Sequence, residues 1–349
     1  MINNSFFSTE ILRWFRENGR DLPWRETRDP YAIWLSEIIL QQTRIAQGWE
    51  YWERFVQTYP KVEDLAAASE DDVLKLWQGL GYYSRARNLH TAAKQIVALG
   101  DFPNTLEGIK SLKGVGDYTA AAIGSFAFDI PAAVVDGNVY RVLSRYFGID
   151  TPINSTQGKK EFAALAQSLL PASDAASYNQ GMMDFGAIQC TPQSPKCLLC
   201  PLAETCEALR CGRVEELPVK NKTVKVKTRH LSYIYIRCKS SAADGIGKSE
   251  PMVAIHRRGE GDIWQGLWEP YNVSDVKELP SFVKNPILLA KDVKHVLTHR
   301  ILLADFYLLE TESRPPLPDD YVWIRESEIE DYGVPRLIEI MLKKINPAE

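Results

Sequence analysis

Apolar residues recur at every third or fourth position from residue 8 to about residue 208, which is the spacing of helices with one buried face. Polar caps and glycines divide this stretch into separate helices. A capping box at residues 69–72 predicts a short helix ending at Gly79, and the next helix is predicted from about residue 82 to residue 99. This part of the chain therefore predicts an all-α domain.

The pattern changes after Cys211. Residues 230–238, 251–258 and 301–310 are rich in β-branched and aromatic residues and are bounded by glycine, serine and proline, so we expect strands there. An amphipathic helix fits residues 335–344. The second part of the chain therefore predicts an α+β domain.

Composition adds little to this picture. At 349 residues the chain is long enough for two domains, and a net charge of −4 excludes a polyanion-coating protein but leaves room for a local basic face. The amino terminus lacks the basic start and apolar stretch of a signal peptide, and the longest apolar run, 120–135, is too short to span a membrane. We therefore expect an intracellular protein without a membrane partner.

Four of the six cysteines are clustered. Cys190, Cys197, Cys200 and Cys206 lie within seventeen residues, close enough for four soft ligands to surround one small metal centre. Buried free cysteines have no reason to cluster in this way, although that alternative exists. The spacing matches neither paired zinc knuckles nor the ferredoxin run, so both zinc and a 4Fe-4S cluster stay open on chemistry alone.

A Gly-Val-Gly sequence separates two predicted helices, one ending near Leu112 and one starting near Asp117. Gly114 and Gly116 permit positive φ and close approach, and the amides at the start of the second helix can then face a phosphate. A plain tight turn is the alternative. Phosphate binding gains support from a nearby run of aromatic and basic residues without acids, although that run also suits a solvated helix face: Tyr82, Tyr83, Arg85, Arg87, His90 and Lys94.

Two carboxylates have unusual neighbours. Glu37 lies among apolar residues of "WLSEIILQQT" and shares a narrow polar stripe with Gln41, which as an isolated pattern is typical of a solvated helix face. Asp136 precedes a helical pattern and is well placed as an N-cap. In an apolar pocket a glutamate has a raised pKa, whereas a capping aspartate bonded to amides stays ionised.

Together these features resemble the helix-hairpin-helix DNA glycosylases and, within them, the MutY family of adenine glycosylases. The resemblance extends over nearly all of residues 8–210 and on into the C-terminal part. Its motifs are "DLPWR" (21–25), "WLSEIILQQT" (34–43), "WQGLGYYSRARNLH" (77–90), "LKGVGDYTA" (112–120), "VVDGNVYRVL" (134–143), "YNQGMMDFGA" (178–187) and the four-cysteine loop.

The resemblance implies an all-α bilobal glycosylase domain at residues 1–213. Its six-helix barrel would span about 25–130, and its iron-sulfur lobe would combine 1–24 with 131–213. A linker at 214–229, which is rich in lysine and arginine, would lead to a Nudix-like domain at 230–349. The four cysteines would hold a 4Fe-4S cluster that builds a DNA-contacting loop and takes no part in hydrolysis.

The resemblance also implies catalytic roles. Glu37 would protonate nitrogen 7 of an extruded adenine and then activate water, and Asp136 would stabilise the cationic sugar. Tyr118 and Asn138 match positions that orient these groups. Tyr118 stands where endonuclease III has a lysine nucleophile, so the resemblance implies water as the nucleophile and a monofunctional enzyme.

Further matches concern DNA. They imply an adenine pocket, two wedges that enter the duplex, hairpin glycines at the phosphates, and lesion recognition by the C-terminal domain. The family's aromatic-Ser-His loop is Leu-Thr-His here, without the aromatic, and the C-terminal domain lacks the glutamate-rich signature of pyrophosphate hydrolysis. The residues are Trp24, Arg25, Leu40, Gln180 and Met183 for the pocket, Gln42 and Tyr82 for the wedges, Gly114 and Gly116 for the hairpin, and Thr298 and His299 for the lesion.

The function implied is base excision repair of adenine mispaired with 8-oxoguanine, and also with guanine, in double-stranded DNA. We expect a monomer in the bacterial cytoplasm, associated with the nucleoid through DNA, or otherwise intracellular. Two alternatives differ in function. Another base specificity in the same superfamily disagrees with Tyr118 and the C-terminal domain, and a non-catalytic iron-sulfur DNA-binding protein would not require Glu37 and Asp136.

Overall fold

The computed structural model describes residues 4–221, 226–239, 250–274 and 279–346. The chain divides into two compact units, one of Met1–Ala67 with Thr91–Lys222 and one of Ala68–His90 with Thr223–Glu349. Residues 222–225 of the expected linker lie outside the described residues. The domain boundaries expected from the sequence stay a prediction.

The first unit is helical throughout its described residues, as expected. Its central helix, α2, is buried from Tyr31 to Ile39 and packs against α3 and α8, while α1 packs against α11. A helix that is apolar on all sides belongs inside a core. The helices are α1 (Asn4–Asn18), α2 (Pro30–Ile39), α3 (Ile45–Thr58), α4 (Val62–Ala67), α7 (Leu106–Lys110), α8 (Asp117–Phe128), α9 (Gly137–Phe147), α10 (Thr156–Leu169), α11 (Ala175–Asp184), α12 (Glu207–Arg210) and the end of α6 (Ser84–Leu99).

Of the expected capping box at the start of α5 (Glu70–Leu76) in the second unit, the N-cap hydrogen bond of Ser69 forms. The Ser69 hydroxyl accepts a hydrogen bond of 3.0 Å from the Asp72 amide. The helix ends at Leu76, three residues before the expected end, and α6 begins at Ser84, two residues later than expected. Gly81 and Tyr82 have φ of +73° and +47°, and this left-handed backbone separates the two helices.

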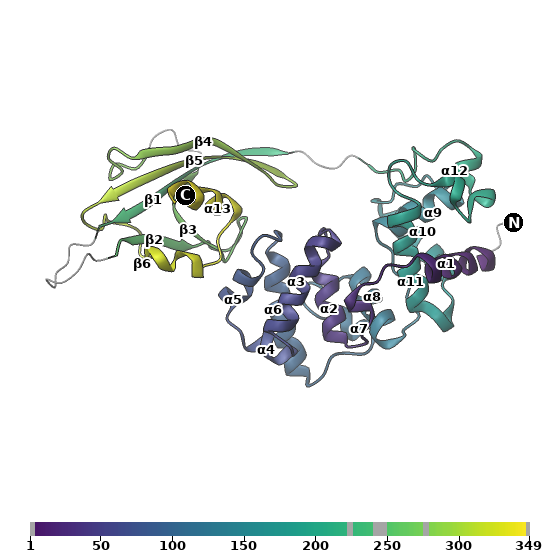
Figure 1. The fold of residues 1–349 in the computed structure, drawn as a ribbon. Helices are drawn as coiled ribbons and strands as arrows, with labels where there is room; N and C mark the ends of the chain where they lie inside the picture. Colours follow the sequence, from purple (N-terminus) through teal and green to yellow (C-terminus); the bar gives the residue numbers. More distant parts are fainter. Residues whose placement is uncertain (1–3, 222–225, 240–249, 275–278, 347–349) are drawn as a thin grey trace. The chain divides into compact units, whose positions relative to one another are not determined.

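A six-stranded sheet forms most of the second unit, in the order β4-β5-β1-β3-β2-β6. The pair β1 and β5 is parallel and the other pairs are antiparallel. Helix α13 (Arg336–Ile345) packs on one face and closes an apolar core there (Figure 1). The strands are β1 (Lys227–Cys238), β2 (Met252–Arg257), β3 (Trp268–Ser274), β4 (Ile287–Val296), β5 (Arg300–Thr311) and β6 (Tyr321–Arg325).

The three expected strands and the expected final helix correspond to β1, β2, β5 and α13. Strands β3, β4 and β6 were missed by the pattern. In β4 the register with β5 shifts twice, between Leu288 and Ala290 and between Ala290 and Val293, which interrupts the alternation that marks a strand. No helix among the described residues is long and apolar enough to cross a membrane.

Candidate active site

A pocket of about 600 Å³ lies within the helical unit. It is lined by residues from the 3₁₀ turn Pro23–Arg25, from α2 and the segment after it, from α8, from the start of α9 and from α11. Ten residues expected from the sequence line it together: Trp24, Arg25, Glu37, Leu40, Gln42, Tyr118, Asp136, Asn138, Gln180 and Met183.

Glu37 projects from the buried helix α2 into this pocket, with only 7% of its surface exposed. A solvated helix face, the alternative for this stretch, is therefore wrong. Burial raises the pKa of Glu37 from 4.5 to about 7, and the negative charge of Asp136 adds to the rise. A hydrogen bond from Tyr118 and the positive charge of Arg25 act in the opposite direction. Glu37 is thus half-protonated near neutral pH.

Asp136 caps the N-terminus of α9, as expected. Its Oδ1 accepts hydrogen bonds of 2.8 Å from the amides of Asn138 and Val139, and its Oδ2 accepts one of 2.7 Å from the Asn138 side chain. Burial raises the pKa of Asp136 above 3.8, whereas these hydrogen bonds and Arg141 oppose the rise. The amide bonding agrees with the expected cap, and the upward direction reflects the desolvation of the carboxylate at the pocket wall.

Tyr118 is the second residue of α8, directly after the glycine hairpin. Its hydroxyl donates to the Glu37 carboxylate. Burial and the charges of Glu37 and Asp136 raise the pKa of Tyr118 well above 10, so the phenol stays neutral and acts as a hydrogen-bond donor.

The hairpin lies outside the pocket. Gly114 has a φ of +79° and needs glycine, whereas Gly116 has an extended backbone with φ of −96°, so only one of the two uses the positive φ that the sequence analysis allows. Gly116 is the N-cap of α8, and a Cβ there would meet no atom within 4 Å. The space around Gly116 leaves the α8 amides open to an approaching phosphate.

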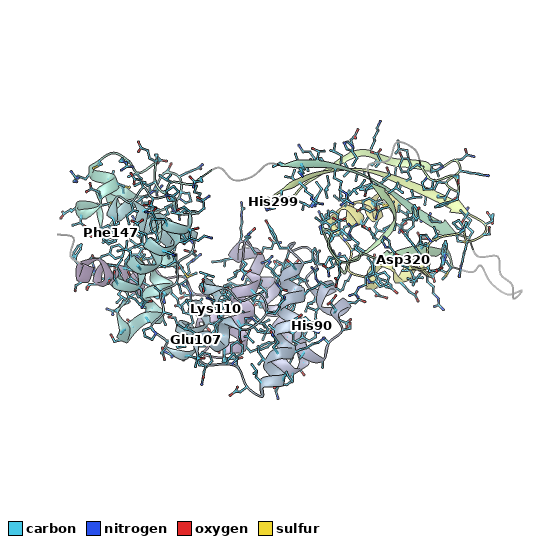
Figure 2. The ribbon with its side chains drawn as sticks, turned by 180° about the vertical axis from the view of Figure 1, so that it is seen from behind. His90, Glu107, Lys110, Phe147, His299 and Asp320 are labelled. Atoms are coloured by element: carbon cyan, nitrogen blue, oxygen red, sulfur yellow. The ribbon has the colours of Figure 1, made fainter. Side chains whose placement is uncertain are left out.

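Three further expected residues lie in the second unit. Thr298 and His299 occupy the tight turn between β4 and β5, which the hydrogen bond from the Leu297 amide to the Arg300 carbonyl closes at 2.8 Å (Figure 2). Tyr82 is 48% exposed, and its hydroxyl lies 2.7 Å from the Thr298 Oγ1. The structure therefore brings a predicted wedge next to a predicted lesion contact.

The two predicted wedges share an unusual backbone. Gln42 has a φ of +55° and Tyr82 a φ of +47°, and both side chains are exposed. Left-handed backbone is costly for side chains of this size and is concentrated at functional sites. Neither residue belongs to a helix or strand, since each lies in the turn that follows or precedes a helix.

The four clustered cysteines surround a small apolar cavity of about 30 Å³ between the end of α11 and α12. Arg145 of α9 borders this cavity, with its Nη1 3.5 Å from the Cys190 Sγ. Within the described residues, no group of His, Cys, Asp or Glu is gathered tightly enough for a single metal ion. Four thiols around one cavity form a donor set that fits a multi-metal centre, and the neighbouring guanidinium can offset the negative charge that the thiolates bring.

Three family models match the chain. Residues 35–171 match the HhH-GPD superfamily of base excision DNA repair proteins, residues 190–206 match the iron-sulfur binding domain of endonuclease III, and residues 246–344 match the NUDIX domain. The iron-sulfur match decides between zinc and a 4Fe-4S cluster. The matched residues contain Cys190, Cys197, Cys200 and Cys206, so these four cysteines are the candidate ligands of the 4Fe-4S cluster.

Curated relatives are more specific. The chain is 39% identical to the adenine DNA glycosylase of Buchnera aphidicola subsp. Acyrthosiphon pisum (strain APS) over 265 residues, which cover 75% of this chain and 73% of that one. The chain belongs to the adenine DNA glycosylase family. The mouse adenine DNA glycosylase is 42% identical over 226 residues, which cover 61% of this chain but only 44% of the mouse protein.

Solved structures agree with the fold of this adenine DNA glycosylase. A thermostable thymine-DNA glycosylase is 34% identical with a TM-score of 0.56, covering 60% of this chain and 97% of that chain. Endonuclease III in a trapped covalent DNA intermediate is 23% identical with a TM-score of 0.53, covering 61% of this chain and 99% of that chain. The predicted helix-hairpin-helix fold, Nudix-like domain and adenine glycosylase activity are confirmed, and DNA is the enzyme's partner.

One further residue, not predicted from the sequence, supports the adenine glycosylase pocket from α9. Arg141 donates from Nη2 to the Asn138 Oδ1 at 2.8 Å and to the Gly186 carbonyl at 2.7 Å, and from Nε to the Cys190 carbonyl at 2.8 Å. Asn138 in turn holds Asp136. Arg141 falls within a quoted motif, but its partners lie up to 49 residues away, so no local pattern marks its role.

Proposed function

We propose that this adenine DNA glycosylase hydrolyses the N-glycosidic bond of adenine mispaired with 8-oxoguanine, and also with guanine, without cleaving the strand. One observation carries the proposal: a buried glutamate with a raised pKa shares a pocket large enough for a nucleobase with an amide-bonded aspartate. Acid on the base side and negative charge on the sugar side are the two needs of glycosidic cleavage.

Glu37 is the proposed acid. Adenine leaves far more readily when nitrogen 7 is protonated, because the bond then breaks to a neutral base. With a pKa of about 7, Glu37 is protonated in a substantial fraction of molecules near neutral pH and gives up the proton at small cost. The resulting carboxylate accepts a proton from water, which attacks the sugar.

Asp136 is the proposed electrostatic partner. Charge develops on the sugar as the base departs, and a fixed carboxylate stabilises it without reorganising. The two backbone amides and the Asn138 side chain hold Asp136 in one orientation. Tyr118 orients Glu37 through its hydrogen bond and, lacking an amine, forms no Schiff base, which supports a monofunctional reaction.

The remaining assignments concern DNA. Trp24, Arg25, Leu40, Gln180 and Met183 would enclose the extruded adenine, since they line the same pocket. Gln42 and Tyr82 would enter the duplex as wedges, with Gly114 and Gly116 beside a phosphate. Thr298 and His299 would contact 8-oxoguanine, and the adjacency of Tyr82 and Thr298 supports a shared role. The proposed active form is a monomer.

The test compares substrates and products. The protein is incubated with duplexes containing A:8-oxoguanine, A:G, A:C, T:G or thymine glycol, and each sample is divided, with one half treated with hot alkali. We expect strand breaks only after alkali, fastest for A:8-oxoguanine and slower for A:G. Breaks without alkali, or a complex trapped by borohydride, would contradict the monofunctional reaction, and equal rates for A:8-oxoguanine and A:C would contradict the lesion preference.

A further inference from the structure

Asp184, the last residue of α11, is a carboxylate with no exposed surface, held between two arginines. Arg25 donates a hydrogen bond to it from each terminal nitrogen, from Nη1 to Oδ2 at 2.8 Å and from Nη2 to Oδ1 at 2.9 Å. Arg20 donates to it from its backbone amide at 2.9 Å and from Nε at 2.9 Å. These partners lie about 160 residues away in sequence, which is why no motif indicates the arrangement.

Asp184 is itself held firmly. Helix α11 continues directly into a π-helical turn, Phe185–Gln189, in which the Cys190 amide donates to the Phe185 carbonyl at 2.8 Å. Gly186 in this turn packs so closely on Asn138 that a Cβ would lie 2.5 Å from the Asn138 Cβ. Turns of this kind recur at functional sites. The turn thus fixes the backbone position from which Asp184 reaches Arg25.

Arg25 is the residue through which the hydrogen bonds of Asp184 reach the pocket. It lines the pocket, and its terminal nitrogens are occupied by Asp184 and by the Arg20 carbonyl at 3.0 Å, so its guanidinium has one orientation. The titratable and charged groups that act on Glu37 are Tyr118 from α8, Asp136 at the start of α9 and Arg25 from the 3₁₀ turn. Arg25 is the cation among these groups.

We infer that Asp184 is a positioning residue of the reaction, which holds the Arg25 guanidinium where its charge stabilises the Glu37 carboxylate that is left after proton donation. This inference rests on the proposed role of Glu37. When Glu37 transfers its proton to adenine, a negative charge appears on a buried side chain that also feels the charge of Asp136, and such a charge is costly without a nearby cation. A bidentate carboxylate fixes a guanidinium better than any single hydrogen bond does.

A buried ion pair could instead serve folding alone, and the two roles differ in what they change. A folding role alters thermal stability and leaves the pH dependence of the reaction unchanged. Under the proposed role, removing the Asp184 carboxylate displaces Arg25. It therefore also shifts the alkaline limb of the pH profile, which is the range above the optimum where the reaction rate falls. Arg20 remains as a partner for Asp184 when Arg25 is replaced.

The experiment measures single-turnover rates of adenine release from an A:8-oxoguanine duplex between pH 5 and pH 9, using the holoprotein. Asp184→Asn is expected to lower the rate at pH 7 at least tenfold and to move the alkaline limb to higher pH, because Glu37 loses a cation that favours its ionised form. Arg25→Met should do the same, and the double variant should be no slower than Arg25→Met. Asp129→Asn, which removes the exposed pair of Asp129 with Arg28, is the matched control and should behave as the native protein.

Three results would overturn the inference. Asp184→Asn could keep both the rate and the alkaline limb of the native protein, or it could react more slowly with an unmoved limb. In the double variant, the rate losses of the two single variants could multiply. If Asp184→Asn does not fold, Arg25→Lys decides, because a lysine keeps the charge but cannot hold both carboxylate oxygens in a planar fork. We expect at least a fivefold loss in Arg25→Lys, and a native rate would overturn the inference.

The parent proposal is checked in the same series. Glu37→Gln must abolish the alkaline limb. If Glu37→Gln stays active with the alkaline limb of the native protein, Glu37 is not the acid. If Glu37→Gln is inactive but Asp184→Asn keeps the rate and pH profile of the native protein, only the positioning role is refuted.

Discussion

The two carboxylates of the pocket differ in the backbone that carries them. Glu37 lies near the end of a buried helix, α2, where only side chains stabilise its negative charge, namely the Tyr118 hydroxyl as a hydrogen-bond donor and Arg25 as a cation. Asp136 lies at the first turn of α9, where two amides and the Asn138 side chain donate to it. Glu37 is buried and Asp136 is half-buried, and desolvation raises both pKa values, but only Asp136 has helix-terminal amides to oppose the rise.

One fold can thus keep an acid and an anion in a single pocket. Amides inside a helix already bond to carbonyls, so a carboxylate there must rely on side chains or keep its proton. Amides in the first turn are free and favour negative charge. The position along a helix thus separates the proposed roles of two groups with the same chemistry, and each prediction below alters one side of that difference.

Glu37→Gln should have the largest effect. The amide fills the same space but has no proton to give, so we expect adenine release to slow about 10³-fold while lesion DNA is still bound. Single-turnover kinetics and a binding titration measure the two properties. Glu161→Gln, at an exposed position on α10, is the control and should keep the native rate. A Glu37→Gln enzyme within tenfold of native would remove Glu37 as the acid.

Asp136→Asn should come next. Asparagine can still cap α9, so the change isolates the negative charge, and we expect a loss of about 10²-fold with unchanged folding. The matched variant is Asp29→Asn, which alters the cap of α2, where the Asp29 side chain accepts from the Tyr31 amide at 3.0 Å. A rate for Asp136→Asn within threefold of native would show that capping is the whole role of Asp136.

Glu37→Gln should also stabilise the protein above neutral pH. The folded state holds the Glu37 proton up to a pKa of about 7, against 4.5 for the ordinary group, so the folded state binds more protons than the unfolded state in this window. Stability from this group is therefore lost as pH rises from about 4.5 to 7, by about 3 kcal/mol in all.

The glutamine variant carries no such pH-dependent cost. Thermal unfolding should therefore show a higher midpoint than native at pH 8, and this gain should shrink toward pH 5. A gain of the same size at both pH values would argue against a raised pKa for Glu37.

Tyr118→Phe should have the smallest effect. The hydroxyl donates to Glu37 and favours its ionised form, so its removal raises the pKa of Glu37 and moves the alkaline limb upward by less than about one pH unit, as expected for one hydrogen bond worth about 1 kcal/mol. The pH profile of single-turnover rates measures this shift. A limb that moves to lower pH would mean that Tyr118 stabilises the protonated acid.

Local patterns predicted the features that are local in sequence. The N-cap at Asp136, the hairpin before Tyr118 and the four-cysteine loop each depend on residues within one or two turns. Arg141 and Asp184 could not be found in this way, because their partners are brought together only by the packing of α9, α11 and the N-terminal segment. The burial of Glu37 could not be predicted from the sequence of its own helix either. A polar stripe on α2 is typical of a solvated face, and it is buried only because α8 and α3 pack against α2.

The most direct test of the account is the protonation of Glu37 itself. Carbon-13 labelling of glutamate side-chain carboxyls, with Glu37→Gln for assignment, allows its titration to be followed by NMR in the folded holoprotein. We predict one glutamate with a midpoint near pH 7 that is missing from the variant. A Glu37 midpoint below pH 5 would mean that the carboxyl is ionised at neutral pH, and it would contradict the role of Glu37 as the proton donor.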